Sequence, residues 1–190
     1  MNGSVLIIFS LFWAYNINAR KIKGEIISSV ARRFQVKFVC FLYSTEEDYK
    51  DSHLLFILNR YLSDQYIFSQ SGSCYHQETQ PNILHVILHE KNAPNFLNKK
   101  TTYSGFWLMY IQSGISLDKV FTGINIPLDS EFLVVHPEDG NVVLTEVYRV
   151  SPSLPLQKLH FGKWNTHTGL ISQGFGFYER RRNLQGINLI

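Results

Sequence analysis

Short apolar runs alternate with amphipathic segments over the first 150 residues of the chain. Runs rich in Val, Ile, Leu and Phe, as in strands buried on both faces, occupy residues 35–43, 82–89, 105–111 and 131–136. Apolar residues at helical spacing, preceded by residues that favour helix starts, predict four helices. They are expected at residues 24–33, from Ser44 or Thr45 through Leu62, at 93–98 and at 113–123. Residues 142–150 alternate like a half-exposed strand, and a polar turn at 137–141 joins them to the preceding strand as a hairpin.

This alternation of strands and helices is the pattern of βαβ units, in which consecutive strands are parallel and helices pack on the sheet. The chain is therefore predicted to be an α/β protein with a mainly parallel sheet, helices on both faces and an antiparallel hairpin at one edge. Residues 69–80, rich in Ser, Gly and Gln, are predicted to form a loop.

After residue 150 the periodicity weakens. Two prolines and five glycines are spread over residues 152–186, so residues 151–178 are predicted to form a linker or an extended arm on the domain. Leu159, Phe161 and Trp164 are large apolar side chains at strand-like spacing in this segment. They are expected to anchor the arm by packing against the α/β core.

The chain begins with an uninterrupted apolar run at residues 5–15, followed by the small residue Ala19 and then the first charges. As a helix this run would be about 16 Å long, against roughly 30 Å for the apolar core of a bilayer, so it is too short to span. The pattern is typical of a secretory signal peptide cleaved after Ala19, and a buried N-terminal helix is the alternative. The predicted organisation is a signal peptide at residues 1–19, an amino-terminal α/β domain at 20–150, and a further segment at 151–190.

The length of 190 residues suits one domain, and 18 Lys and Arg against 15 Asp and Glu give a net charge of +3. This small charge and an apolar fraction of 45% exclude a disordered chain and a nucleic-acid protein that depends on bulk charge. Two cysteines exclude a disulfide-rich miniprotein and a four-cysteine zinc site. In an oxidising compartment Cys40 and Cys74 could pair with each other.

Candidate catalytic and metal-binding patterns are weak. His85 and His89 lie in a predicted strand, where side chains four residues apart are separated by roughly 13 Å, too far for one metal ion. The nucleophile motif Gly-x-Ser-x-Gly is absent, and Cys74 near His76 has no sequence signature of a thiol nucleophile. Glycines at 174 and 176 lack the rest of a phosphate-binding loop. The sequence therefore predicts no catalytic residue, no metal and no cofactor.

Three motifs near the C-terminus carry a family resemblance. They are Glu146-x-Tyr148 at the end of a strand, Gly162-x-Trp164, and the string Arg180, Arg181, Arg182, Asn183, Leu184 and Gly186. This succession resembles the insect chemosensory ionotropic receptors, which are variant ionotropic glutamate receptors, and the layout before it looks like the amino-terminal domain of the 75a subgroup.

The resemblance implies that residues 180–186 form the junction with a ligand-binding domain. The ligand-binding arginine, the pore and the membrane helices of the family would lie beyond Ile190, so none of these can be assigned here, and the chain looks like the front of a longer protein. The arginine run, residues 180–182, is expected to lie outside the domain, where it could pair with acidic groups of the ligand-binding domain or of a neighbouring subunit.

The resulting function hypothesis is a non-enzymatic, extracellular amino-terminal domain of a chemosensory ligand-gated cation channel. Its role would be folding, assembly with co-receptor subunits and support of the ligand-binding domain; nucleic acid is not an expected partner, and the chain carries no membrane span of its own. The first alternative is a stand-alone secreted protein that binds a small molecule at the carboxyl ends of its parallel strands. The second is a secreted hydrolase on the same fold.

Overall fold

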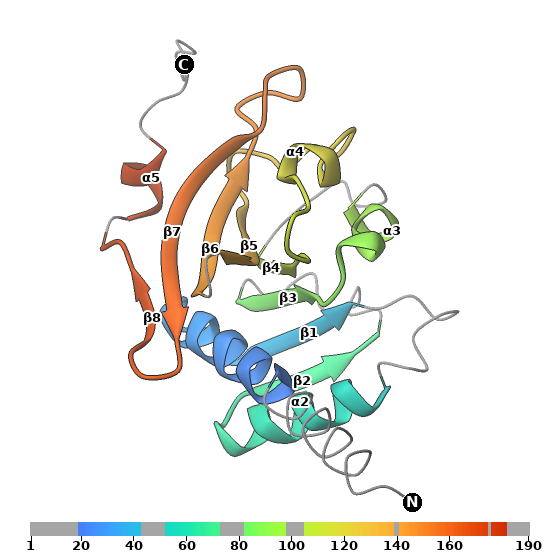
Figure 1. Ribbon diagram of the computed structural model, residues 1–190, viewed down its shortest axis with the longest axis vertical. Helices are drawn as coiled ribbons and strands as arrows, with labels where there is room; N and C mark the ends of the chain where they lie inside the picture. The colour runs from blue at the N-terminus through green and yellow to red at the C-terminus, as the bar shows by residue number, and fades with distance from the viewer. Residues whose placement is uncertain are drawn as a thin grey trace, which may run out of the picture.

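The computed structural model describes residues 19–42, 52–72, 82–97, 105–138, 141–174 and 176–181. These residues form an eight-stranded sheet in the order β2-β1-β3-β4-β5-β6-β7-β8 (Figure 1). The strands are β1 Phe38–Leu42, β2 Phe68–Ser71, β3 Ile83–Ile87, β4 Phe106–Tyr110, β5 Glu131–Glu138, β6 Asn141–Tyr148, β7 Gln157–Asn165 and β8 Gly169–Ser172.

One helix precedes the first strand, one follows the last strand, and the others lie between strands. Residues 19–33 are helical and are drawn in blue without a label in Figure 1; we call them the N-terminal helix. The others are α2 Ser52–Asp64, the short 3-10 helix η3 Glu90–Asn92, α3 Ala93–Leu97, α4 Leu117–Val120 and α5 Phe177–Arg180. Within the described residues, every helix is too short or too polar to cross a lipid bilayer.

The first five strands are parallel to their neighbours, and the remainder of the sheet is antiparallel. β1 lies between β2 and β3, and β3, β4 and β5 follow in order. β5 and β6 form the predicted antiparallel hairpin. The prediction of an α/β fold with a mainly parallel sheet and an antiparallel edge is therefore confirmed.

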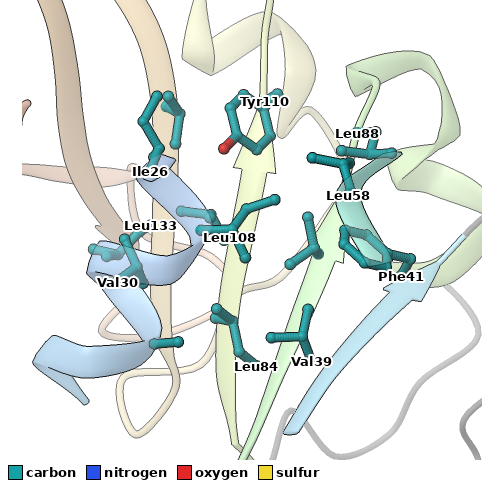
Figure 2. Packing of buried hydrophobic residues seen from close by; sticks show 14 of the residues in the cluster. Ile26, Val30, Val39, Phe41, Leu58, Leu84, Leu88, Leu108, Tyr110 and Leu133 are labelled. Atoms are coloured by element: carbon teal, nitrogen blue, oxygen red, sulfur yellow. The ribbon is translucent and has the colours of Figure 1, made fainter. Parts of the chain in front are cut away.

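Apolar side chains of the sheet pack against helices on both faces. On one face the N-terminal helix and α2 contact the sheet through residues such as Ile26, Val30 and Leu58, which belong to one buried cluster with Leu108 and Leu133 (Figure 2). On the other face α3 and α4 cover a second cluster, which includes Phe96, Trp107, Phe121 and Phe132. Helices on both faces were predicted because strands without a polar face need cover on each side.

The segment predicted as a linker or an extended arm on the domain, residues 151–178, contains two strands that extend the sheet, β7 and β8. β7 pairs with β6 from Gln157 to Trp164, and β8 extends the same sheet. Gly162 was counted as a sign of a flexible segment, but the packing of β7 requires a glycine at this position. A Cβ on Gly162 would clash with the backbone carbonyl oxygen of Ile171, so the close approach of β7 to β8 requires a residue without a side chain.

Smaller differences concern segment ends. The predicted loop at residues 69–80 begins with the short edge strand β2, and the helix predicted at 113–123 is shortened to Leu117–Val120. Ser116 stands before α4 as predicted, but its backbone oxygen, not its hydroxyl, accepts the first helical hydrogen bonds. The signal peptide prediction falls almost entirely on residues outside the described part of the chain, as does the predicted helix start at Ser44 or Thr45.

Candidate functional site

Two glutamates and two arginines meet where the described chain leaves the sheet, and we call Glu131, Glu146, Arg180 and Arg181 the exit clamp. Glu131 begins β5, Glu146 lies in β6, and the arginines lie at the end of α5 and directly after it. Both arginine side chains are buried, with 5% and 3% of their surface exposed. The expectation that the arginine run lies outside the domain is wrong for Arg180 and Arg181; Arg182 lies outside the described residues.

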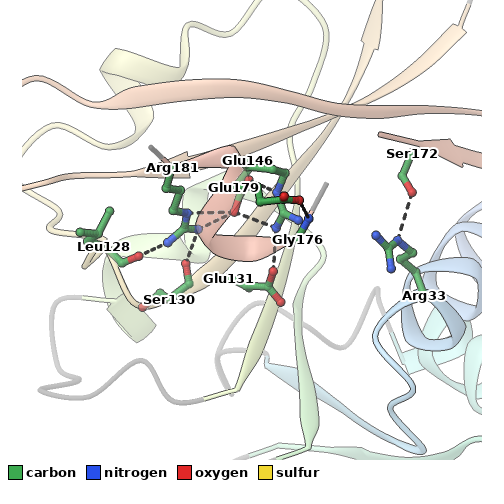
Figure 3. A network of polar contacts seen from close by, with 10 residues as sticks. Arg33, Leu128, Ser130, Glu131, Glu146, Ser172, Gly176, Glu179 and Arg181 are labelled. Atoms are coloured by element: carbon green, nitrogen blue, oxygen red, sulfur yellow. Dashed lines mark hydrogen bonds and ion pairs between the residues drawn. The ribbon is translucent and has the colours of Figure 1, made fainter. Parts of the chain in front are cut away.

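Glu146 is the centre of the exit clamp, because it contacts both arginines and its side chain has no exposed surface. Nε of Arg180 donates to Oε2 of Glu146 at 2.8 Å, and Nη2 of Arg181 donates to Oε1 at 2.5 Å (Figure 3). Nη2 of Arg180 also donates to Oε1 of Glu131 at 2.7 Å. Two positive and two negative charges therefore balance within a largely buried cluster.

Arg181 has further partners that fix its position. Its guanidinium donates to the backbone oxygens of Leu128 and Ser130, which precede β5 (Figure 3). It also lies 4.5 Å from the ring centre of Tyr148 and 4.0 Å from that of Phe177. A planar guanidinium can make these bidentate and stacked contacts together, whereas a lysine ammonium cannot.

Burial and ion pairing shift the pKa values of the exit-clamp residues in opposite directions. Burial raises the pKa of Glu131 above its ordinary value of 4.5, although the bond from Arg180 works against this. Burial also lowers the pKa of Arg181, and the charge of Glu146 recovers part of that loss. For Arg180 burial is outweighed by its bonds to Glu146 and Glu131, so its pKa is raised. Both guanidinium groups stay charged at neutral pH, so removing Glu146 leaves Arg181 buried without its carboxylate partner.

Local contacts fix the start of the short helix α5 and the end of the strand before it. The backbone N–H of Gly176 donates to Oε2 of Glu179 at 3.0 Å, which ties the start of the helix to its own first turn. Beside it, Nε of Arg33 in the N-terminal helix donates to the hydroxyl of Ser172 in β8 at 3.1 Å (Figure 3). The end of β8, which precedes α5, is thus tied to the N-terminal helix.

The three residues proposed as arm anchors lie in β7. Phe161 and Trp164 are buried in the cluster beneath the N-terminal helix, and Leu159 is half-buried. The Phe161 ring lies 5.8 Å from that of Phe34, and the Arg180 guanidinium lies 5.3 Å from its centre. Phe161 therefore joins the hydrophobic core to the exit clamp.

Cys40 lies in the buried part of β1 and is disulfide-bonded, and the described residues contain no free cysteine. Cys74, the other cysteine of the sequence, lies outside the described residues, and its pairing with Cys40 stays a prediction. Such a bond would tie the segment after β2 to the centre of the parallel sheet.

Thiol labelling tests this pairing. We expect unreduced, denatured protein from a secreting host to take up no thiol reagent, because an oxidising compartment leaves both sulfurs in the disulfide. The same sample after reduction should take up two equivalents, one for each cysteine of the sequence, which provides the control. Labelling of both cysteines before reduction would exclude the bond.

The other candidate site residues from the sequence have structural roles. His85 is buried in β3 and stacks on Trp107 with ring centres 4.6 Å apart, while His89 follows the strand and is half-buried. Across the described ranges no group of three His, Cys, Asp or Glu side chains could hold a metal ion. His76 and the junction residues Asn183, Leu184 and Gly186 lie outside those ranges.

The sequence reasoning missed Glu131 and the contact that joins the motifs. Glu146 and Tyr148 were noted as one motif and Arg180 and Arg181 as another, 32 or more positions away. The usable signal was Glu146 itself: a carboxylate within the alternating strand at residues 142–150 needs a cation if its position is buried. The nearest dense group of cations in the following sequence is the arginine run.

Comparison with known proteins gives one family. A family model described as Ionotropic receptor 75a N-terminal matches residues 74–190, which is more than half of the chain. No curated protein and no solved structure matches the chain. The matched range contains the strands β3 to β8 and all four residues of the exit clamp.

Proposed function

The chain belongs to the ionotropic receptor 75a N-terminal family, and we propose that it acts as the extracellular amino-terminal domain of a chemosensory ligand-gated cation channel. In this role it supports folding, assembly with co-receptor subunits and placement of the ligand-binding domain. A receptor domain of this kind is not an enzyme. The full-length receptor would lie at the extracellular face of the plasma membrane.

The contact between Glu146 and the two arginines is the observation that supports this placement role best. It joins residues from the two motifs that carry the family resemblance and lies at the point where the chain continues toward residues 182–190. A fully paired, buried ion cluster adds little net stability but fixes one geometry, because any displacement leaves charges unpaired in an apolar environment. The exit clamp would therefore give the following domain a fixed starting position.

Expression of a full-length receptor with its co-receptor subunits tests the proposal. Glu146→Ala should reduce both the co-precipitation of partner subunits and the amount of receptor at the cell surface, because the exit of the domain loses its fixed geometry. Glu138→Ala, an exposed position in β5, is the matched control and should change neither. If the receptor with Glu146→Ala assembles and reaches the surface like wild type, the support role is wrong.

Export is a separate prediction. Protein secreted from insect cells should begin at Arg20 or within a few residues of it, because the small residue Ala19 ends the apolar leader. Sequencing of the N-terminus of the recovered protein measures this. Recovery of secreted protein with an intact Met1 would exclude a cleaved signal peptide.

The reading frame after codon 190 separates the receptor from the stand-alone alternative. An open frame that continues into long apolar helices supports the receptor proposal, whereas a stop codon supports a secreted binding protein. The distinction matters for the exit clamp, because a chain that ended at Ile190 would have no following domain to place.

A further inference from the structure

Two places in the chain carry consecutive arginines, Arg32–Arg33 and the arginine run at residues 180–182. Consecutive arginines are the cleavage signal of serine endoproteases that are specific for paired basic residues. The signal peptide predicted at residues 1–19 would take the chain through the secretory compartments in which proteases of this class act. The structure presents the two places in different ways.

The first pair lies at the surface. Arg32 and Arg33 are both exposed at the end of the N-terminal helix. Arg32 donates to the hydroxyl of Ser28 at 2.8 Å, and Arg33 donates to the hydroxyl of Ser172 at 3.1 Å. Both partners are neutral, so these arginines can leave their partners without uncovering a buried charge. This pair therefore serves as a reference site within the same chain.

The second pair is hidden in the exit clamp (Figure 3). The side chains of Arg180 and Arg181 are 5% and 3% exposed, although the preceding residues Tyr178 and Glu179 are exposed. A protease that reads paired arginines has to bind their guanidinium groups with acidic groups of its own. The exit clamp already holds those groups with carboxylates. The clamped chain and the protease-bound chain are therefore mutually exclusive states.

The same two arginines attach this segment to the sheet. The helix α5 has four residues, which is too short to be stable by itself. The bond from Gly176 to Glu179 is internal to the segment. Among the contacts described above, those that join α5 to the sheet come from Arg180 and Arg181. Opening of the exit clamp would therefore free α5 and the arginine pair in one step.

We propose that the exit clamp conceals a paired-basic cleavage site, and that its opening exposes the peptide bond after Arg181 to a serine endoprotease of this class. In the hydrolysis the C–N bond between Arg181 and Arg182 breaks, and water supplies a hydroxyl to the carbonyl carbon and a hydrogen to the nitrogen. The rate of cleavage should follow the population of molecules with an open clamp.

Cleavage at this bond would detach the domain from everything that follows it. A receptor would then keep its ligand-binding domain connected only when the exit of the amino-terminal domain is correctly folded. This consequence rests on the proposed function. The cleavage itself does not, because it can be measured on the 190-residue chain alone.

Digestion of the purified full chain with kexin, a serine endoprotease that cuts after paired basic residues, tests the proposal. Mass analysis reports the rates of cleavage at the arginine run and at Arg33 separately. We expect a synthetic peptide of residues 174–188 to be cut readily. Folded wild-type chain should be cut at the arginine run on the order of a hundredfold more slowly, because opening has to precede cleavage.

Two variants open the exit clamp and keep the cleavage signal. Glu146→Gln removes the charge that both arginines share. Arg181→Lys keeps consecutive basic residues but cannot make the bidentate and stacked contacts of the guanidinium. Each should raise the rate at the arginine run at least about tenfold, or about 1.4 kcal/mol in the opening equilibrium, and leave the rate at Arg33 unchanged. Glu138→Ala, at an exposed position in β5, is the matched control and should change neither rate.

A further variant separates opening of the exit clamp from a general loss of stability. Leu58 has no exposed surface and lies in α2, in the parallel half of the fold. Leu58→Ala should therefore destabilise the domain as a whole and raise the rates at Arg33 and at the arginine run in the same proportion. Circular dichroism of each variant establishes that it is folded before digestion.

Three results would overturn the proposal. Resistance of the peptide would show that proteases of this class do not read the arginine run, and a wild-type chain cut there as fast as the peptide would show that the exit clamp conceals nothing. Folded Glu146→Gln and Arg181→Lys that are cut at the wild-type rate, or at both sites in proportion like Leu58→Ala, would show that the exit clamp does not control cleavage.

Discussion

Replacing Glu146 with alanine is expected to lower the free energy of unfolding by about 3–5 kcal/mol, the usual effect of removing one partner from a buried ion pair. The expected effect is large because one carboxylate serves two guanidinium groups, those of Arg180 and Arg181, which are themselves buried. Arg180 keeps Glu131 as a partner, while Arg181 keeps only backbone oxygens and aromatic rings among the contacts described above. Denaturant unfolding followed by circular dichroism measures the change.

Two variants separate charge from other effects at this site. Glu146→Gln keeps an oxygen acceptor of similar size and should destabilise less than Glu146→Ala, yet clearly, because the negative charge is lost. Glu138→Ala removes an exposed carboxylate from the neighbouring strand and should stay within about 0.5 kcal/mol of wild type. Similar stabilities for Glu146→Ala and Glu138→Ala would mean that the exit clamp is not held together by its charges.

The parallel half of the fold could be predicted because its signals are local. Strands such as residues 82–89 and 105–111 are nearly continuous apolar runs, and in the structure they are buried on both faces as β3 and β4. Their length and separation are enough to indicate βαβ units. No knowledge of distant contacts was needed for this step.

The antiparallel extension β7 and β8 could not be predicted in the same way. Its glycines and prolines resemble those of a linker, while the feature that stabilises it is pairing with β6, which the sequence of residues 151–172 does not display. Gly162 illustrates the ambiguity: glycine indicates flexibility in an isolated segment and close backbone approach inside a sheet. The clue available was the alternation of Leu159 and Phe161, which also suits a strand.

Part of the exit clamp could be recognised from the sequence. The motifs around Glu146 and Arg181 stood out, but their mutual contact spans 35 positions and depends on the sheet that brings β6 beside α5. Charged runs are usually solvated, and that general tendency led to the wrong expectation for Arg180 and Arg181. Arg180 and Arg181 depart from this tendency because their partners, Glu131 and Glu146, are buried with them.

Replacing Trp164 with alanine gives the second large effect, and it tests whether β7 belongs to the cooperative fold. Trp164 has 4% of its surface exposed and packs in the cluster beneath the N-terminal helix. Large-to-small changes at buried aromatic residues usually lower the free energy of unfolding by about 3–5 kcal/mol, because the lost contacts and the remaining cavity add together. We expect a loss of this size in denaturant unfolding.

Trp164→Phe is the matched control. The indole N–H of Trp164 has no hydrogen-bond partner within the described part of the chain, so phenylalanine keeps the aromatic packing and removes a buried unpaired donor. Its effect should therefore be much smaller than that of alanine, on the order of 1 kcal/mol. A large loss with both variants would show that the indole group itself is required.

Limited proteolysis with mass analysis then distinguishes a strand from a docked arm. If residues 157–172 were an arm lying on a finished domain, Trp164→Ala would expose new cleavage sites there and leave the rest of the chain resistant. Because seven residues of β7 between Gln157 and Trp164 pair with β6, and Phe161 in the same strand contacts Arg180 of the exit clamp, loosening β7 also loosens the exit. Cleavage in Trp164→Ala should therefore spread across β5 to β8 and α5 together, since elements that share one sheet and one ion cluster open as a single cooperative unit.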